Sequence, residues 1–219
     1  MTCWAIWKVR NDVVWKGKIP RVATVHHLAT SMLEQWTRAQ NKVETPTAAY
    51  LTKEDGVEKW RLPAEGVVKV NVDAALFSEI PAFIYACVAR DSHGHVLEAI
   101  TCCRQGVVSP EMAEAMGVRE ALSWIKRKNW NHVLIETDCL TVIQALRSRV
   151  KMDSYFGSVI SECKSLWSAL NLVDLLFVKR SANNVAHAIG RASCSVADRA
   201  FRSDDFSPAI CDVILKDIC

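Results

Sequence analysis

The chain has 219 residues, half of them hydrophobic, and a formal net charge of +3. A chain of this length and apolar content can bury the core of one ordinary domain and carry an extension. Its 27 basic and 24 acidic residues nearly balance, so the composition excludes a basic surface that covers the whole protein. A polyanionic partner is compatible with this charge if its binding surface is local.

Nine cysteines are scattered along the chain, and none forms a C-x-x-C pair or a pattern with zinc spacing. Their odd number and placing predict reduced thiols, as in an intracellular protein of the nucleus or cytoplasm. The N-terminus does not predict secretion, because Lys8 and Arg10 directly follow a short apolar start. No apolar run is long enough to span a bilayer, so no membrane partner is expected.

The N-terminal part is expected to be helical over residues 1–42. Apolar side chains recur there at helical spacing in two sets: Trp4, Trp7 and Val14, then Val25, Leu28, Met32 and Trp36. Residues 43–65 follow as a linker, since they are mostly polar and are interrupted by proline and glycine. The sequence leaves the role of the helical segment open.

From residue 66 the pattern changes to that of an α/β domain. Apolar and alternating runs predict strands over residues 67–77, 83–90 and 95–103. The turn between the last two is predicted at Asp91-Ser92-His93-Gly94, where glycine takes the final position. These three strands are expected to form an antiparallel meander.

A helix starts after the meander, where Ser109 caps it and Pro110 takes its first position, and it extends to about residue 128. The remaining elements are expected as a strand at 133–137, helices at about 140–150 and 156–170, a strand at 173–179 and a helix from 184 that ends before 204. The order βββαβααβα predicts a mixed sheet covered by helices, with the first and fourth strands adjacent and parallel. The domain is expected over residues 66–200, followed by a tail over 201–219.

Three acidic residues have local contexts that should bring them together. Asp73 ends the alternating run 68–73, Asp138 ends the run 132–138, and Glu114 lies in the apolar stripe of the helix that starts at Ser109. An inward-facing carboxylate is costly unless a cation or a metal ion pairs with it. Each acid alone has a structural explanation, as a strand-end acid or as a charge near a helix N-terminus. Together they predict a site for divalent metal ions, which can hydrolyse phosphodiesters.

Five short motifs occur in a fixed order along the domain. They are Lys69-Val70-Asn71-Val72-Asp73, Arg90-Asp91-Ser92-His93-Gly94, Ala113-Glu114-Ala115, Glu136-Thr137-Asp138 and Asn183-Asn184-Val185-Ala186-His187. In this order they resemble the type 1 ribonuclease H domain over about residues 60–200. The most similar version is the plant form, which is related to the C-terminal domain of non-LTR retrotransposon reverse transcriptases.

The resemblance implies a ribonuclease H-like fold with a five-stranded mixed sheet. It also implies that Asp73, Glu114 and Asp138 hold two Mg²⁺ ions, or Mn²⁺ in their place, with Asp73 between the ions. A metal-bound water would attack a phosphate of the RNA strand in an RNA–DNA hybrid, leaving a 3′-hydroxyl and a 5′-phosphate. Oxygen ligands suit Mg²⁺, and 2′-hydroxyl contacts would distinguish the hybrid from duplex DNA. The expected protein is a monomeric, metal-dependent endoribonuclease.

Four further positions take roles from the same resemblance. His187 stands where other members of the family carry a fourth acid, and it is expected to be an outer metal ligand or a proton shuttle. A helix histidine that is satisfied by local hydrogen bonds is the alternative. Asn71, Ala74 and Asn183 are expected to contact the nucleic acid.

Ala74, Ile84 and Ala86 stand where the family has glycines. Because glycine permits close approach of a ligand, these replacements are expected to crowd the minor groove of a bound hybrid. The densest basic cluster is Lys126-Arg127-Lys128, which is expected to contact phosphates. Cations that complement the dipole of a helix C-terminus are the alternative explanation.

Three functions remain open from the sequence. The first is hydrolysis of RNA–DNA hybrids, which the three intact acids favour. The second is a nucleic-acid-binding protein that kept the fold and lost turnover, which the replaced glycines favour. The third is a protein-interaction module that uses the tryptophan-rich N-terminal helices.

Overall fold

The structure is a computed structural model that describes residues 2–17, 22, 23, 25, 26, 29, 30, 51–77, 79, 81–193 and 198–218. The chain divides into two compact units, Met1–Ala49 and Tyr50–Cys219. Within the described parts, no helix combines the length and hydrophobicity that crossing a membrane requires. All seven cysteines of the described parts are free thiols.

The first unit contains the helix α1, Thr2–Lys16, as the sequence predicts for this segment. The helix ends at Gly17, which adopts a φ of 59° and donates its N–H to the carbonyl of Val13. Glycine is favoured at such a left-handed position after a helix. Leu28, Met32 and Trp36 of the second predicted helical set lie outside the described residues, as do residues 43–50 of the predicted linker.

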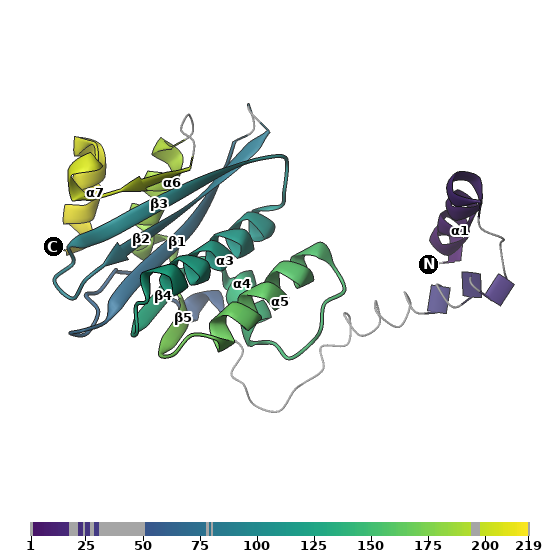
Figure 1. Ribbon diagram of the computed structural model, residues 1–219, viewed down its shortest axis with the longest axis horizontal. Coiled ribbons are helices and arrows are strands. Elements are labelled where there is room, and N and C mark those ends of the chain that lie inside the picture. The colour runs from purple at the N-terminus through teal and green to yellow at the C-terminus, as the bar shows by residue number, and fades with distance from the viewer. Residues whose placement is uncertain are drawn as a thin grey trace. The chain divides into compact units, whose positions relative to one another are not determined.

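The second unit is built on a mixed sheet in the order β5-β4-β1-β2-β3-β6 (Figure 1). Its strands are β1 Val68–Phe77, β2 Ala82–Arg90, β3 Val96–Gln105, β4 Val133–Thr137, β5 Val173–Phe177 and β6 Arg199–Phe201. The first three form the predicted antiparallel meander. Strands β4 and β5 run parallel to β1, which confirms the prediction that the first and fourth strands are adjacent and parallel.

Helices cover both faces of this sheet (Figure 1). They are α3 Pro110–Lys128, α4 Leu140–Arg147, α5 Tyr155–Ser168, α6 Asn184–Ala192 and α7 Pro208–Ile218. Helices α3, α4 and α5 bury one face, where Val70 and Val72 of β1 have no exposed surface. Helices α6 and α7 bury the other face over Ala86 and Val88 of β2. The element order βββαβααβα is therefore confirmed from β1 to α6.

The C-terminal region differs from the prediction. Helix α6 ends at Ala192, before residue 204 as predicted, but residues 199–201 add a sixth strand that pairs antiparallel with β3. A strand of three residues is too short to show an alternating pattern, so the sequence did not indicate it. The boundary expected at residue 200 falls inside this strand. Helix α7 packs against α6 through Ile210, which is 7% exposed.

The segment before β1 also belongs to the packed unit. Val57 forms a parallel bridge with Val178, and Trp60 is only 6% exposed. The Trp60 indole donates to Asn71 on β1 at 3.0 Å. Part of the predicted linker thus covers the same face of the sheet as α6 and α7.

Candidate metal centre

The fold brings the three predicted acids to one end of the sheet. Asp73 lies on β1, and Asp138 directly follows β4, whose Thr137 is in register with Val72. Glu114 lies in the second turn of α3, which Ser109 caps by accepting the N–H of Met112. One carboxylate oxygen from each acid lies within 4.8 Å of the others.

Close packing of α3 on the sheet sets the position of Glu114. Gly117 follows it by almost one turn, and a Cβ added at Gly117 would lie 3.1 Å from atoms of Val72 and Tyr85. A larger residue at this position would push the helix away from the strands. The glycine therefore allows the Glu114 carboxylate to reach Asp73.

Burial makes this cluster of acids electrostatically costly. Asp73 has no exposed surface, and burial, followed by the charge of Asp138, raises its pKa from 3.8 to about 6. Burial raises the pKa of Glu114 well above its ordinary value, and the charges of Asp73 and Asp138 add to this effect. Such a cluster is stabilised when a cation neutralises it.

Glu114 offers the clearest indication of a missing partner. Its Oε1 accepts the backbone N–H of Ala74 at 3.1 Å, but its buried Oε2 has no hydrogen-bond partner among the described residues. A buried oxygen without a partner is unfavourable. Carboxylate oxygens are the ligands that Mg²⁺ and Mn²⁺ prefer. The donor set of Asp73, Glu114 and Asp138 therefore fits a divalent metal ion.

Arg180 is a residue of this site that the sequence analysis missed. It begins the short 3₁₀ turn η2, Arg180–Ala182, which follows β5. Its Nη1 donates to Asp73 Oδ1 at 3.0 Å and to Asp138 Oδ2 at 2.9 Å. Because β5 runs parallel to β4, the chain after β5 emerges at the same edge as Asp138. That topology was the one signal that could have indicated Arg180.

His187 lies at the edge of the same cluster, on α6. Its Nδ1 is 2.9 Å from Asp73 Oδ2 and 2.6 Å from Arg180 Nη2. The side chain is 34% exposed, so it faces both the acids and solvent. The structure thus brings the predicted fourth residue next to the triad.

Asn183 is also part of the site, but as an internal contact. It is 1% exposed, and its Nδ2 donates to the carbonyl of Val72 at 2.8 Å and to Asp138 Oδ1 at 2.9 Å. These two bonds hold the Asp138 carboxylate beside β1. The arrangement gives Asn183 a role in orienting Asp138 and leaves its side chain little surface for a nucleic acid.

Asn71, which is expected to contact a nucleic acid, does not lie at the surface. It has no exposed area, and its Oδ1 accepts from Trp60 and from Arg90 at 3.0 Å each. Its Nδ2 donates to Glu136 at 2.9 Å. The covering segment that contains Trp60 and helix α7 close over this position, so the Asn71 side chain is internal in this structure, and its expected contact with a nucleic acid stays a prediction.

The three positions where the family has glycine are buried as well. Ile84 is 1% exposed and Ala86 is fully buried beneath α6, where it lies near Gly190. Ala74 packs its side chain with Phe83 in a small apolar cluster and keeps its N–H bond to Glu114. Ile84 and Ala86 lie beneath the surface, and the expected crowding of a bound hybrid at these positions stays a prediction.

The basic cluster Lys126-Arg127-Lys128 forms the last turn of α3. Arg127 pairs with Glu120 at 2.7 Å and Lys128 pairs with Glu98 at 2.7 Å. With a rise of 1.5 Å per residue, Lys126 lies about 18 Å along the helix from Glu114. The cluster is thus remote from the acids, and its expected phosphate contacts stay a prediction.

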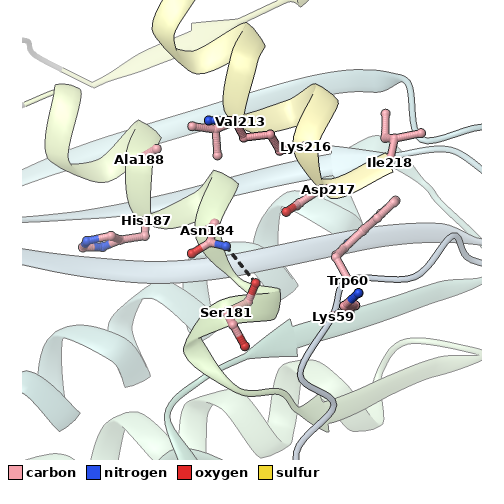
Figure 2. Close-up of a pocket in the computed structure, with 10 residues that line it drawn as sticks. All are labelled: Lys59, Trp60, Ser181, Asn184, His187, Ala188, Val213, Lys216, Asp217 and Ile218. Atoms are coloured by element: carbon pink, nitrogen blue, oxygen red, sulfur yellow. Dashed lines mark hydrogen bonds between the residues drawn. The ribbon is translucent and has the colours of Figure 1, made fainter.

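A pocket of about 590 Å³ adjoins the site between α6, α7 and the segment before β1 (Figure 2). His187 lies on its wall towards the acids, and the exposed Lys59 and Lys216 line it. Neither lysine forms an ion pair with a described residue. Two lysines without an ion pair to a described residue thus line the pocket that His187 also lines, and each is adjacent in sequence to a residue of its wall, Trp60 or Asp217.

Comparison with solved structures identifies relatives of the fold. Ribonuclease H1 from the archaeon Halobacterium salinarum NRC-1 superposes with a TM-score of 0.52 at 15% identity, covering 58% of this chain and 96% of that chain. The N-terminal RNase H domain of a Mycobacterium tuberculosis protein gives 0.51 at 16% identity, with 58% and 92% covered. LC11-RNase H1, isolated from compost and solved in complex with an RNA/DNA hybrid, gives 0.50 at 12% identity, with 57% and 94% covered.

These identities are low, so the likeness shows the fold, and the ribonuclease H-like prediction is confirmed apart from the sixth strand. No curated protein matches the sequence. The family described as reverse transcriptase-like matches residues 71–193, which span Asn71 on β1 to Ser193 after α6. The match includes all three acids, Arg180 and His187, and it covers more than half of the chain. The chain therefore belongs to the reverse transcriptase-like family and has its ribonuclease H-like domain, related to that of retroelement reverse transcriptases.

Proposed function

We propose that this protein is a metal-dependent endoribonuclease that cleaves the RNA strand of RNA–DNA hybrids. The observation that carries the proposal is the cluster of Asp73, Glu114 and Asp138, in which the buried Glu114 Oε2 lacks a partner. Three clustered acids, two of them buried, are unfavourable for stability without enough cations, and such arrangements are typical of functional sites. The likeness to ribonucleases H1, one of them solved with an RNA/DNA hybrid, supports the substrate class.

The three acids would hold Mg²⁺, or Mn²⁺ as the alternative. When bound, such ions supply a nucleophile at neutral pH and stabilise the charge that develops on the phosphate. Asp73 is central to the site. Its Oδ1 accepts from the Arg180 nitrogen that also donates to Asp138, and its Oδ2 contacts His187 Nδ1. Asn183 orients Asp138, and the Ala74 N–H orients Glu114, so each ligand is held by a neighbouring backbone or amide group.

His187 is suited to move a proton at the edge of this site. It contacts the Asp73 carboxylate on one side and is partly open to solvent on the other. An imidazole can accept or donate a proton near neutral pH. We assign it to protonating the leaving oxygen or assisting product release, as a group that helps the reaction without assembling the site.

A thiol nucleophile is not part of this proposal. Cys139 directly follows Asp138, but burial raises the pKa of its thiol to about 12. A thiol with such a pKa is almost fully protonated at neutral pH and is a poor nucleophile.

The direct test is cleavage of an end-labelled RNA–DNA hybrid with millimolar Mg²⁺, analysed on a denaturing gel. We expect internal cuts in the RNA strand only, with 5′-phosphate ends, and no cuts in duplex DNA. The Asp73→Asn variant serves as the control for contaminating nuclease. Equal cleavage by wild type and Asp73→Asn, or none by a folded wild type at any divalent metal, would reject the proposal.

A hybrid-binding protein without turnover is the second candidate. The specific observation in its favour is Arg180, which neutralises Asp73 and Asp138 without a metal ion. In that case wild type binds the hybrid in a salt-sensitive manner but releases no product. Binding and cleavage measured on the same preparation separate the two candidates.

A further inference from the structure

The Arg180 guanidinium lies against the same oxygen atoms that a metal ion needs. Its Nη1 is 3.0 Å from Asp73 Oδ1 and 2.9 Å from Asp138 Oδ2, so one nitrogen bridges two of the three predicted ligands. We propose that Arg180 is a built-in counter-ion that competes with divalent metal ions for Asp73 and Asp138. The inference rests on the proposed function, since it takes these acids as metal ligands.

The surroundings of Arg180 allow it to leave the site. Its side chain is 53% exposed, whereas Asp73 has no exposed surface and Asp138 is 12% exposed. Arg180 sits in a short turn of three residues that follows β5, and the residue is exposed. Among the described residues, the hydrogen bonds to the two aspartates and the contact with His187 are what hold the guanidinium in place. A long, half-exposed side chain of this kind can exchange between two positions without moving the backbone.

The charges explain why the competition is unequal. Arg180 supplies one positive charge to three clustered acids and makes no bond to Glu114, whose Oε2 stays without a partner. A divalent ion supplies twice the charge and can accept all three carboxylates as ligands. Arg180 therefore compensates only part of the negative charge in the metal-free protein. A divalent ion that replaces it can compensate more of this charge and also bind Glu114.

Competition has a measurable consequence for metal affinity. When a competent state is only partly populated, the apparent affinity is reduced by the fraction that is competent. If Arg180 occupies the aspartates for about 90% of the time, its removal raises the apparent metal affinity about tenfold. The opposite role, in which Arg180 orders the aspartates for the ion, predicts that its removal weakens metal binding.

The experiment is calorimetric titration of Mn²⁺ and Mg²⁺ into the full chain, without nucleic acid. Arg180→Met removes the charge and keeps most of the length of the side chain, and Arg180→Lys keeps the charge but loses the planar fork. Arg119→Met is the matched control, because Arg119 also pairs with a carboxylate, that of Glu162, and its loss changes the net charge equally.

We expect Arg180→Met to bind metal about tenfold more tightly than wild type, and Arg180→Lys to lie between them. Arg119→Met should stay within about twofold, since distant surface charges are screened. Unchanged or weaker binding by folded Arg180→Met, together with metal binding by wild type, would overturn this inference and leave the proposed nuclease intact. Absence of metal binding in wild type and both Arg180 variants would reject the inference and the nuclease together. If Arg180→Met does not fold, the metal affinity of Arg180→Lys is the test: tighter binding than wild type supports the inference, and unchanged or weaker binding overturns it.

Discussion

Two groups of polar side chains lie next to each other along β1, where Asn71 of one and Asp73 of the other are only two residues apart, and they are built differently. The first, which we call the charge network, comprises Lys69, Asn71, Arg90, Glu136 and Asp217, covered by Trp60. Lys69 pairs with Glu136 at 2.6 Å and Arg90 pairs with Asp217 at 3.0 Å, so two cations balance two anions. The second is the metal centre of Asp73, Glu114 and Asp138, which has three anions, one half-exposed arginine and one buried oxygen without a partner.

The comparison separates polar groups that hold the fold from groups that can act. In the charge network, the Arg90 guanidinium also stacks 3.6 Å from the centre of the Trp60 ring, and Asn71 links the two ion pairs. A buried pair is strongly destabilised when one partner is removed, because the other charge stays buried and unpaired. In the metal centre the charges are unbalanced before any change, so removing one acid relieves repulsion. Opposite effects on stability and activity are therefore expected in two neighbouring groups on one strand.

The largest expected effect is the loss of cleavage in Asp73→Asn and Asp138→Asn. Each change removes a charged ligand, and several kcal/mol of transition-state stabilisation go with it, so hybrid cleavage should fall at least about 10³-fold. The metal-free stability of Asp73→Asn should equal or exceed that of wild type, measured by urea unfolding in EDTA. If Asp73→Asn or Asp138→Asn lost cleavage because the variant is unfolded, these acids would be needed for stability as the charge network is, and the proposed difference between the two groups would be contradicted.

The reverse pattern is expected for Arg90→Met in the charge network. This change leaves the Asp217 carboxylate without its buried partner and removes one of the two donors to Asn71 Oδ1, so the free energy of unfolding should fall by about 3–5 kcal/mol. Arg127→Met is the control, because it breaks the exposed pair with Glu120 and should cost less than about 1 kcal/mol. A loss below 1 kcal/mol in Arg90→Met would show that the network contributes little to stability.

The two groups also differ in how far the sequence could predict them. The approach of Asp73 to Asp138 follows from the parallel pairing of β1 with β4, although β1 continues past Asp73 to Phe77, and strands give a local periodic signal. The partner of Arg90 is Asp217, which lies 127 residues away on a helix that the sequence suggested only as a tail. Long-range contacts of this kind have no local pattern, and for that reason the burial of Asn71 was missed.

Arg180 was missed for a different physical reason. It lies in a turn, where basic residues are common and usually exposed, and only the direction of that turn brings it to Asp73 and Asp138. Sequence periodicity specifies the axis of a strand but not the path of the chain after it. The sequence thus allowed the positions of Asp73 and Asp138 to be predicted, but it did not allow the position of Arg180 to be predicted.

A pH titration sharpens the comparison through Asp73. Its pKa is raised from 3.8 to about 6 in the folded protein, so the folded state binds this proton more tightly than the unfolded chain. The resulting stabilisation is fully present below about pH 4 and is lost as the pH rises through 6. In EDTA, wild type should lose on the order of 2 kcal/mol relative to Asp73→Asn over this range. Addition of Mg²⁺ at pH 7 should restore stability to wild type only. A constant difference between the two proteins from pH 4 to 7 would contradict the raised pKa.

His187→Ala should have an intermediate effect on activity and little effect on stability. A group that transfers a proton contributes about 10²–10⁴-fold, and a partly exposed histidine should lie at the lower limit. We therefore expect about 10²-fold slower cleavage, with metal affinity close to that of wild type. Single-turnover rates and metal titration on the same variant test both parts. Loss as large as that in Asp73→Asn would instead make His187 an essential ligand.

The smallest expected effect concerns where the nucleic acid lies. Lys59 and Lys216 line the pocket that reaches His187, whereas Lys126 and Lys128 lie at the far end of α3 from Glu114. The pairs Lys59→Glu/Lys216→Glu and Lys126→Glu/Lys128→Glu change the net charge equally, so they are matched. In EDTA, the first pair should weaken binding of a fluorescent hybrid about tenfold and flatten its salt dependence, while the second changes it less than about threefold. The opposite order would place the hybrid along α3 and support the phosphate contacts that the sequence predicts for that basic cluster.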